Sequence, residues 1–146
     1  MNAIYLAGNI SGLSYHEATD WRNTVTCDLR DKFLILDPMR GKKHLSNTTL
    51  GFSDNSVGCT TKEIFTRDTF DVFNCNIILA YITGYSIGTA FEIGMSYTLD
   101  KHIVIVTTPE LALHPFLSES ANYLTTELND AVKYILDEVE YFSYSF

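Results

Sequence analysis

One carboxylate stands in a stretch that is otherwise uncharged: Glu92 is the only side chain charged at neutral pH between residues 77 and 99. If a helix begins near Ser86, Glu92 shares a stripe with Gly88 one turn before it and Ser96 one turn after it. These small residues leave room for a ligand to approach the carboxylate. We expect the helix to be mostly buried, because it is apolar or small on nearly every face. Glu92 is then either an ordinary surface residue or a carboxylate at the floor of a cleft.

A second carboxylate interrupts the apolar face of a helix predicted over residues 62–75. Four side chains define that face: Ile64, Phe65, Val72 and Cys75. Asp68 falls in the middle of them, which is out of pattern for an acid. It either bonds a nearby backbone group as a structural residue or belongs to a functional site. Two carboxylates placed in this way are candidates for covalent and acid–base chemistry.

The bulk composition restricts the class of protein. With 146 residues and 46% hydrophobic content, we expect one globular domain over residues 1–146. A net charge of −8 argues against binding to nucleic acid or to an anionic membrane. Neither the three cysteines nor the four histidines show the spacing of a metal site, so we expect no metal and no cofactor.

Two apolar segments could be interpreted as a signal peptide and as a membrane span. Local sequence features argue against both interpretations. The N-terminus has no basic region before its apolar run, so we do not interpret it as a signal peptide. The uncharged stretch 77–99 is broken by the sequence TGYS at 83–86, which favours a strand, a turn and a helix over a membrane span. We expect a cytoplasmic protein with reduced thiols.

Apolar runs and helical spacing alternate along the chain. We expect strands at 3–7, 33–36, 76–82, 102–106 and 122–124, and helices opening at Ser14, over 62–75, near Ser86 and over 126–142. Residues 39–61 are interpreted as a lid or a disordered loop, of which we favour the lid, and 109–120 as irregular. The alternation predicts an α/β fold with a doubly wound parallel sheet.

In such a sheet, ligands bind at the carboxyl ends of the strands. Tyr5 and Gly8 on the first strand, Arg40 after the second and Ser86 after the third all lie at that edge. Glu92 is about one helical turn further in. The expected site therefore combines Glu92 with residues that follow three different strands.

Several segments together resemble the nucleoside 2-deoxyribosyltransferase family. They are IYLAG at 4–8, DPMRGK at 37–42, RD at 67–68, NIILA at 76–80, SIGT at 86–89 and EIG at 92–94. The resemblance spans most of the chain in the right order, and the last two segments are its most specific part. It implies a flavodoxin-like, Rossmann-like sheet of five parallel strands and cleavage of the N-glycosidic bond of 2′-deoxynucleosides. It also implies a homo-oligomer in which a neighbouring subunit helps to complete each active site.

The resemblance assigns roles to individual residues. Glu92 matches the nucleophile, Tyr5 the hydroxyl that hydrogen-bonds it, and Asp68 the carboxylate that handles the base. Gly8 is expected to let the backbone approach the base, and Arg40 lies in the loop that covers it. A carboxylate can capture the oxocarbenium-like state at C1′ covalently, and a protonated acid helps the base to leave.

The sequence departs from the family pattern at two positions. Asn9, which we include among the substrate-binding candidates, stands where the family usually has proline. Asn76 stands where an aspartate usually begins the third strand, away from the expected chemistry. We expect Asn9 to change only the stiffness of its loop.

Three functions remain open from the sequence. The first, which we favour, is transfer of the 2-deoxyribose of a 2′-deoxynucleoside to another free nucleobase. The second is hydrolysis of 2′-deoxynucleoside 5′-monophosphates, and the third is a pocket protein that only binds nucleotide-like ligands. Ser86 helps to distinguish the first function from the second. Relatives that act on free nucleosides carry an acid at this position. A hydroxyl beside Gly88 at the start of a helix suits a phosphate instead. Ser118 is a further candidate donor to that phosphate.

The last six residues are rich in aromatic side chains and read YFSYSF. Left free on a monomer, they would expose a large apolar patch. We expect them to pack into the interface of a homodimer or a multiple of dimers, with folding back onto their own domain as the alternative.

Overall fold

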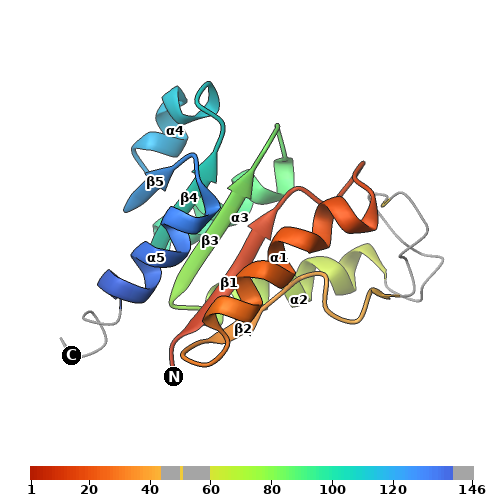
Figure 1. Ribbon diagram of the computed structural model, residues 1–146. Coiled ribbons are helices and arrows are strands. Elements are labelled where there is room, and N and C mark those ends of the chain that lie inside the picture. Colours follow the sequence, from red (N-terminus) through yellow and green to blue (C-terminus); the bar gives the residue numbers. More distant parts are fainter. Residues whose placement is uncertain (44–49, 51–59, 140–146) are drawn as a thin grey trace.

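Five parallel strands form the central sheet of the computed structural model, which describes residues 1–43, 50 and 60–139. The strands are β1 (Ala3–Gly8), β2 (Leu34–Leu36), β3 (Ile77–Ile82), β4 (His102–Thr107) and β5 (Tyr123–Thr125), in the order β2-β1-β3-β4-β5. The chain winds outward from β1 to β2 and then in the other direction from β3 to β5 (Figure 1). This confirms the predicted doubly wound sheet and places its switch point between β1 and β3.

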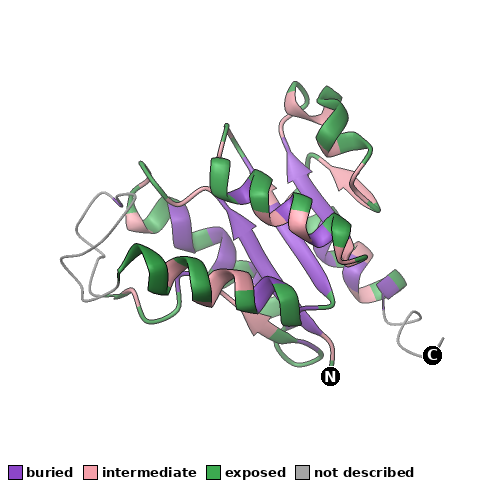
Figure 2. Cartoon of the chain, turned by 180° about the vertical axis from the view of Figure 1, so that it is seen from behind, coloured by how far each residue is buried: buried purple, intermediate pink, exposed green. Residues whose placement is uncertain are grey.

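Two layers of helices cover the sheet, so that the domain is a three-layer α/β structure. One face carries α1 (Tyr15–Leu29) and α5 (Leu128–Glu138), and the other carries α2 (Thr61–Asn74) and α3 (Ile87–Thr98). Figure 2 shows that the three central strands, β1, β3 and β4, are almost entirely buried, whereas the edge strands β2 and β5 are only partly covered. Because both faces are covered, the strand sequences are apolar at nearly every position.

The start of α1 follows from a local sequence signal. The Ser14 hydroxyl accepts a hydrogen bond from the Glu17 backbone N–H, and the Glu17 carboxylate accepts one from the Ser14 backbone N–H. This capping box satisfies donors that the first turn of a helix leaves unpaired. Thr60 and Glu63 form the same arrangement at the start of α2.

The α2–α3 surface is more exposed than the sequence predicted. We expected α3 to be mostly buried, but its buried side chains are Thr89, Ile93 and Ser96, while Ile87 is 90% exposed. Phe65 of α2, predicted for the core face, is also exposed. Both helices pack on the sheet with one side only, and within the described residues their outer sides remain uncovered.

Three predictions about the remaining segments have different outcomes. Residues 109–120 are not wholly irregular, because they contain a short 3₁₀ helix (Leu111–Leu113) and α4 (Pro115–Ser118), which starts with the proline that a first helical turn accepts. Most of the predicted lid over 39–61 and the whole of the aromatic tail lie outside the described residues. Among the helices that are described, none has the length and apolar character needed to cross a membrane.

Candidate active site

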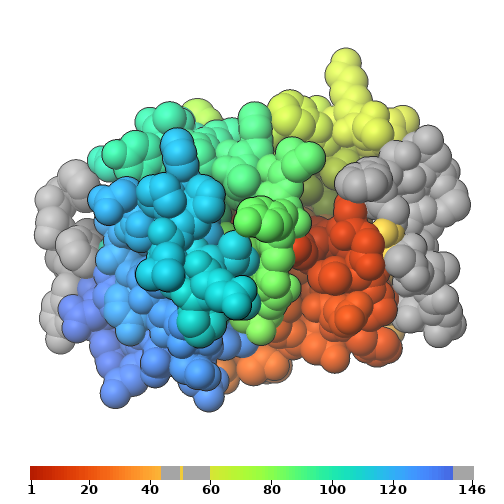
Figure 3. Space-filling model, turned by 90° about the horizontal axis from the view of Figure 1, so that it is seen from above, coloured from red at the N-terminus to blue at the C-terminus, as the bar shows by residue number. Residues whose placement is uncertain are grey.

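A cavity of about 810 Å³ opens at the carboxyl edge of the sheet, beside the switch point. Figure 3 looks onto this edge, where the start of the chain in red meets the segment after β3 in green. The lining comes from four regions: the end of β1 and its loop, the segment after β2, α2, and the start of α3. The lining residues used below are Gly8, Asn9, Lys42, Asp68, Ser86, Gly88, Thr89 and Glu92.

Glu92 lines this cavity and contacts the buried Tyr5. The Tyr5 hydroxyl donates a hydrogen bond of 2.8 Å to Oε1 of Glu92, which joins β1 to α3. Tyr5 has no exposed surface, because it lies among the core side chains between the sheet and the α2–α3 layer. The carboxylate is therefore held in one orientation by a buried donor, as a nucleophile requires.

Burial dominates the electrostatics of Glu92. Although the side chain keeps some contact with solvent through the cavity, the protein around it raises its pKa to about 7. The hydrogen bond from Tyr5 lowers this pKa, the nearby Asp68 carboxylate raises it, and the Arg22 guanidinium lowers it. Near neutral pH, Glu92 therefore exists in both protonation states.

Asp68 lies on α2 and lines the same cavity. Burial raises its pKa, whereas the guanidinium of Arg67, 3.1 Å away, and the charge of Lys42 lower it. The net shift is upward, so this carboxyl group is a better proton carrier near neutral pH than an ordinary aspartate. The structure thus brings Tyr5, Asp68 and Glu92, from three different elements, to one site.

Ser86 is the N-cap of α3 and also lines the cavity. Its hydroxyl accepts a hydrogen bond of 3.3 Å from the Thr89 backbone N–H and lies 3.0 Å from the Thr89 hydroxyl. Gly88 has open space where a side chain would stand, so its lack of a Cβ keeps the cavity free above Glu92. The amino end of α3, with its partial positive charge, forms this part of the wall.

The structure gives Gly8 a second reason to be glycine. A Cβ at this position would lie 2.8 Å from the ring of Trp21 and 2.9 Å from the Tyr81 carbonyl oxygen. Neighbouring Asn9 reaches from its side-chain nitrogen toward the carbonyls of Gly84 and Tyr85, at 3.4 and 3.5 Å. Asn9 therefore links the loops after β1 and β3 at the rim of the cavity.

Two predicted substrate-binding residues are not brought to the cavity in the described part of the chain. The Arg40 guanidinium lies 2.7 Å from the Asp71 carboxylate, and it also donates to the Asp37 carbonyl. Ser118 lies on α4, where its hydroxyl donates to the Pro115 carbonyl at 3.4 Å. Within one subunit, both side chains therefore make contacts away from the cavity.

Two residues of the site were missed by the sequence analysis. Lys42 lines the cavity and influences Asp68, and its position at the end of the DPMRGK segment was the available signal. Arg22 is completely buried on α1, in a position that helical spacing assigns to the core. In the described residues, no cluster of three or more His, Cys, Asp or Glu side chains is arranged to hold a metal ion.

Comparison with family models gives one match: a model described as nucleoside 2-deoxyribosyltransferase covers residues 4–135. A search of curated proteins gives no match.

Solved structures with this fold include two deoxyribosyltransferases. One is from Bacillus psychrosaccharolyticus, with 19% identity, 94% of each chain covered and a TM-score of 0.66. The other is from Leishmania mexicana, with 15% identity, 94% of this chain and 99% of that chain covered and a TM-score of 0.68. A molybdenum cofactor carrier protein from Chlamydomonas reinhardtii also matches, with 20% identity, 96% and 98% coverage and a TM-score of 0.64. At these identities, the structural matches establish the fold and do not establish the activity, which depends on the residues of the site.

Proposed function

This chain belongs to the nucleoside 2-deoxyribosyltransferase family, and from that membership we propose that it is an enzyme that breaks the N-glycosidic bond of 2′-deoxynucleosides. The proposed reaction transfers the 2-deoxyribose to another nucleobase through a covalent intermediate on Glu92. One observation carries the proposal: Glu92 lines one cavity together with Asp68, and the buried Tyr5 hydroxyl donates a hydrogen bond of 2.8 Å to the Glu92 carboxylate.

In the first half-reaction, the ionised Glu92 attacks C1′ of the deoxyribose. The bond between C1′ and the base nitrogen breaks, and its electron pair leaves with the base. Protonated Asp68 donates a proton to the base as it leaves, so that a neutral base is released. Tyr5 keeps the Glu92 carboxylate directed at the sugar. The products are the free base and a deoxyribosyl ester of Glu92.

In the second half-reaction, a nitrogen of the incoming base attacks C1′ from the side that the first base left. Asp68, now a carboxylate, accepts the proton that this nitrogen loses. The bond between C1′ and the Glu92 oxygen breaks, and its electrons restore the carboxylate. A water molecule in place of the base would give hydrolysis by the same steps.

Product analysis tests the proposal directly. The protein is incubated with each deoxynucleoside and each 5′-monophosphate, with and without a second base, and the products are separated by chromatography. Transfer yields a new nucleoside only when the second base is present, whereas hydrolysis yields free base in either case. The absence of both products from every substrate would contradict the proposed function.

A second candidate function is hydrolysis of 2′-deoxynucleoside 5′-monophosphates, and the wall beside Ser86 favours it. A phosphate placed there would meet the amino end of α3 and the Ser86 and Thr89 hydroxyls. The capping role of Ser86 is compatible with this. Its hydroxyl accepts from the Thr89 backbone N–H and can turn its own proton from the Thr89 hydroxyl, to which it donates, toward a phosphate.

We expect Ser86→Ala to distinguish the two substrates. If the phosphate binds at this wall, the variant loses about tenfold in kcat/KM for the monophosphate and little for the nucleoside, because only the phosphate uses the hydroxyl. The measurement compares kcat/KM for a deoxynucleoside and its monophosphate in both proteins. Ser14→Ala, which removes the N-cap hydroxyl of α1 and does not line the cavity, is the matched control. A nucleoside preference that survives Ser86→Ala would exclude the hydrolase.

The third function, binding without catalysis, has a fold relative in the molybdenum cofactor carrier protein. A carrier needs a cavity but has no use for an oriented nucleophile or a proton carrier. The Tyr5–Glu92 hydrogen bond and the nearby Asp68 therefore favour an enzyme over a carrier. We also propose a cytoplasmic location, in keeping with the free thiols of Cys27 and Cys75.

The proposed assembly is a homodimer or a multiple of dimers, and the outer surface of α2, α3 and α4 supports it. The rings of Phe65 and Phe91 contact each other at 6.0 Å between centroids on this surface, and both are more than half exposed. A largely apolar cavity of about 560 Å³ lies between α3 and α4. A monomer would leave this apolar surface in contact with water.

We expect the protein to be a dimer or larger at micromolar concentration, and Phe91→Glu to shift it toward the monomer. The substitution places a charge where apolar side chains of two subunits would meet. Multi-angle light scattering measures the mass, with Asn23→Glu on exposed α1 as the control. A wild-type protein that elutes as a monomer would rule out this interface.

A further inference from the structure

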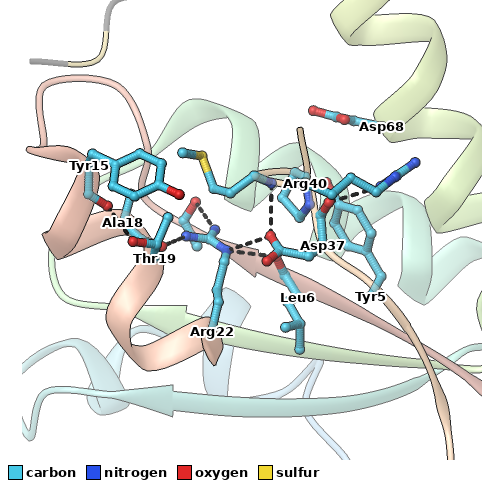
Figure 4. A network of polar contacts seen from close by, with 12 residues as sticks. Tyr5, Leu6, Tyr15, Ala18, Thr19, Arg22, Asp37, Arg40 and Asp68 are labelled. Carbon is cyan, nitrogen blue, oxygen red and sulfur yellow. Dashed lines mark hydrogen bonds and ion pairs between the residues drawn. The ribbon is translucent and has the colours of Figure 1, made fainter. Parts of the chain in front are cut away.

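A buried arginine on α1 binds the carboxyl end of β1, next to the candidate active site. We propose that Arg22 is a positioning residue, which fixes the carboxyl ends of β1 and β2 and thereby the placement of Gly8 and Asp68 around the cavity. The part of this inference that concerns turnover rests on the proposed function. Figure 4 shows the guanidinium between α1 and the segment that carries Asp37.

The guanidinium binds the end of β1 on the side where β2 no longer pairs with it. Pairing with β2 ends at Tyr5, opposite Leu36, whereas pairing with β3 continues to Gly8. Arg22 donates to the carbonyls of Leu6 and Gly8, at 3.4 and 3.2 Å, and to the Ala18 carbonyl of its own helix. The fixed fork of an arginine suits such a set of acceptors, and a lysine could not reproduce it.

Two further contacts hold this side chain in place. Arg22 has no exposed surface, and its guanidinium carbon lies 4.5 Å from the centre of the Trp21 ring. Its Nε lies 3.6 Å from Oδ1 of Asp37, the first residue after β2. Because a buried charge without a partner is costly, the ion pair and the three carbonyls together make this position tenable.

Asp37 connects Arg22 to the turn that follows β2. The oxygen that faces Arg22 also accepts a hydrogen bond of 2.8 Å from the Met39 backbone N–H. The intervening Pro38 carbonyl accepts a hydrogen bond of 2.7 Å from Arg67. Arg67 in turn pairs with Asp68 at 3.1 Å. A continuous series of contacts thus runs from Arg22 to the acid that lines the cavity.

The charge of Arg22 also acts on Glu92, since it favours the ionised carboxylate against the effect of burial. The other titratable or charged groups around Glu92 come from β1, α2 and two loops: Tyr5, Arg67, Asp68, Lys42 and Tyr85. On the neighbouring strands, the ring of Tyr81 of β3 contacts Trp21 at a tilt, and His102 lies at the amino end of β4. Arg22 therefore acts on the pKa of Glu92 by its charge, without contacting the carboxylate.

The test compares Arg22→Met, which removes charge and donors, with Arg22→Lys, which keeps the charge and loses the fork. Arg30→Met, an exposed change at the end of the same helix, is the control. Protein labelled with ¹³C at the glutamate carboxyl carbons is titrated by NMR, and the spectrum of Glu92→Gln assigns the Glu92 signal. Folding is checked by circular dichroism, and kcat/KM is measured on each variant.

We expect Arg22→Met to raise the midpoint of the Glu92 titration by about half a pH unit or more, and Arg22→Lys to leave it near the wild-type value. Both variants should lose at least about tenfold in kcat/KM, because the end of β1 is no longer fixed. Arg30→Met should change neither quantity. In Arg22→Lys, the amide signals of Gly8 and Met39 should also shift.

A folded Arg22 variant with lower thermal stability but with an unchanged Glu92 titration, unchanged Gly8 and Met39 signals and unchanged kcat/KM would overturn the proposal. If Arg22→Met does not fold, the amide signals and kcat/KM of Arg22→Lys decide in the same way. If the wild-type protein turns over none of the substrates, the proposed function fails. The titration and the amide signals then still decide the role of Arg22.

Discussion

Glu92→Gln is expected to reduce turnover at least about 10³-fold while leaving the fold intact. Glutamine has nearly the same shape, and its carbonyl oxygen can still accept the hydrogen bond from Tyr5. It cannot, however, form the covalent bond to C1′. The measurement is kcat on the best substrate found by product analysis. Mass spectrometry of the stalled wild-type enzyme should show a deoxyribosyl group on Glu92, and a trapped sugar on any other residue would contradict the assignment.

Glu92→Gln is also expected to change how the stability of the protein depends on pH. The pKa of Glu92 is about 7 in the folded protein, against 4.5 for an ordinary glutamate. Between these values the folded state binds more protons than the unfolded state, so the contribution of Glu92 to stability falls as the pH rises. The full difference corresponds to about 3 kcal/mol.

Glu92→Gln should therefore be more stable than wild type at pH 8 and about equally stable near pH 4.5. Denaturant unfolding at the two pH values measures the difference. Equal stability of the two proteins at pH 8 would show that the carboxylate is not held in a buried environment.

Asp68→Asn is expected to lower kcat by about 10²- to 10⁴-fold and to change KM much less. Asparagine keeps the size of the side chain and its ability to bond Arg67, but it carries no transferable proton. The loss should be smaller for a substrate whose leaving base is more acidic, because such a base needs less protonation to depart. Steady-state kinetics on a series of bases measures this trend.

Asp28→Asn, an exposed change on α1, is the control for the loss of one negative charge. Wild-type rates for Asp68→Asn at all pH values would remove Asp68 from the mechanism. An equal loss for all leaving bases would assign it to binding instead of proton transfer.

Local signals predicted most of the fold, because they act over a few residues. Ser14 and Glu17 define the start of α1, and the apolar spacing of Ala18, Val25 and Leu29 defines its core face. Buried parallel strands are apolar throughout, so β1, β3 and β4 could be recognised from composition. The alternation of elements predicted a doubly wound parallel sheet with right-handed connections, and the structure gave the order of its strands.

The exposure of the α2–α3 surface could not be predicted in the same way. The sequence of α3 is apolar on nearly every face, and this pattern fits a buried helix as well as a helix that binds another subunit. Only the packing shows that Thr89, Ile93 and Ser96 face the sheet while Ile87 faces outward. Hydropathy indicates that a side chain avoids water, but it does not indicate which part of the protein or which subunit covers that side chain.

For the candidate site, the sequence by itself determined which carboxylates are unusual. Glu92 stands without another charge in its segment, and Asp68 stands on an apolar face. Both observations depend only on residue types and helical spacing, and the resemblance in the motifs supplied Tyr5 as their companion. In the structure, Glu92 and Asp68 line one cavity, and Tyr5 lies buried beside Glu92 and hydrogen-bonds it.

The tertiary structure alone decided how the polar side chains around the site are paired. Arg22 occupies the core stripe of α1, yet the sequence does not show that β2 ends at Leu36 and leaves β1 carbonyls for it to bind. Arg40 follows a strand end, as a ligand-binding residue would, but Asp71 lies within 2.7 Å of it. The physical reason is that an ion pair depends on distance in space, and residues far apart in sequence are brought within that distance only when the chain has folded.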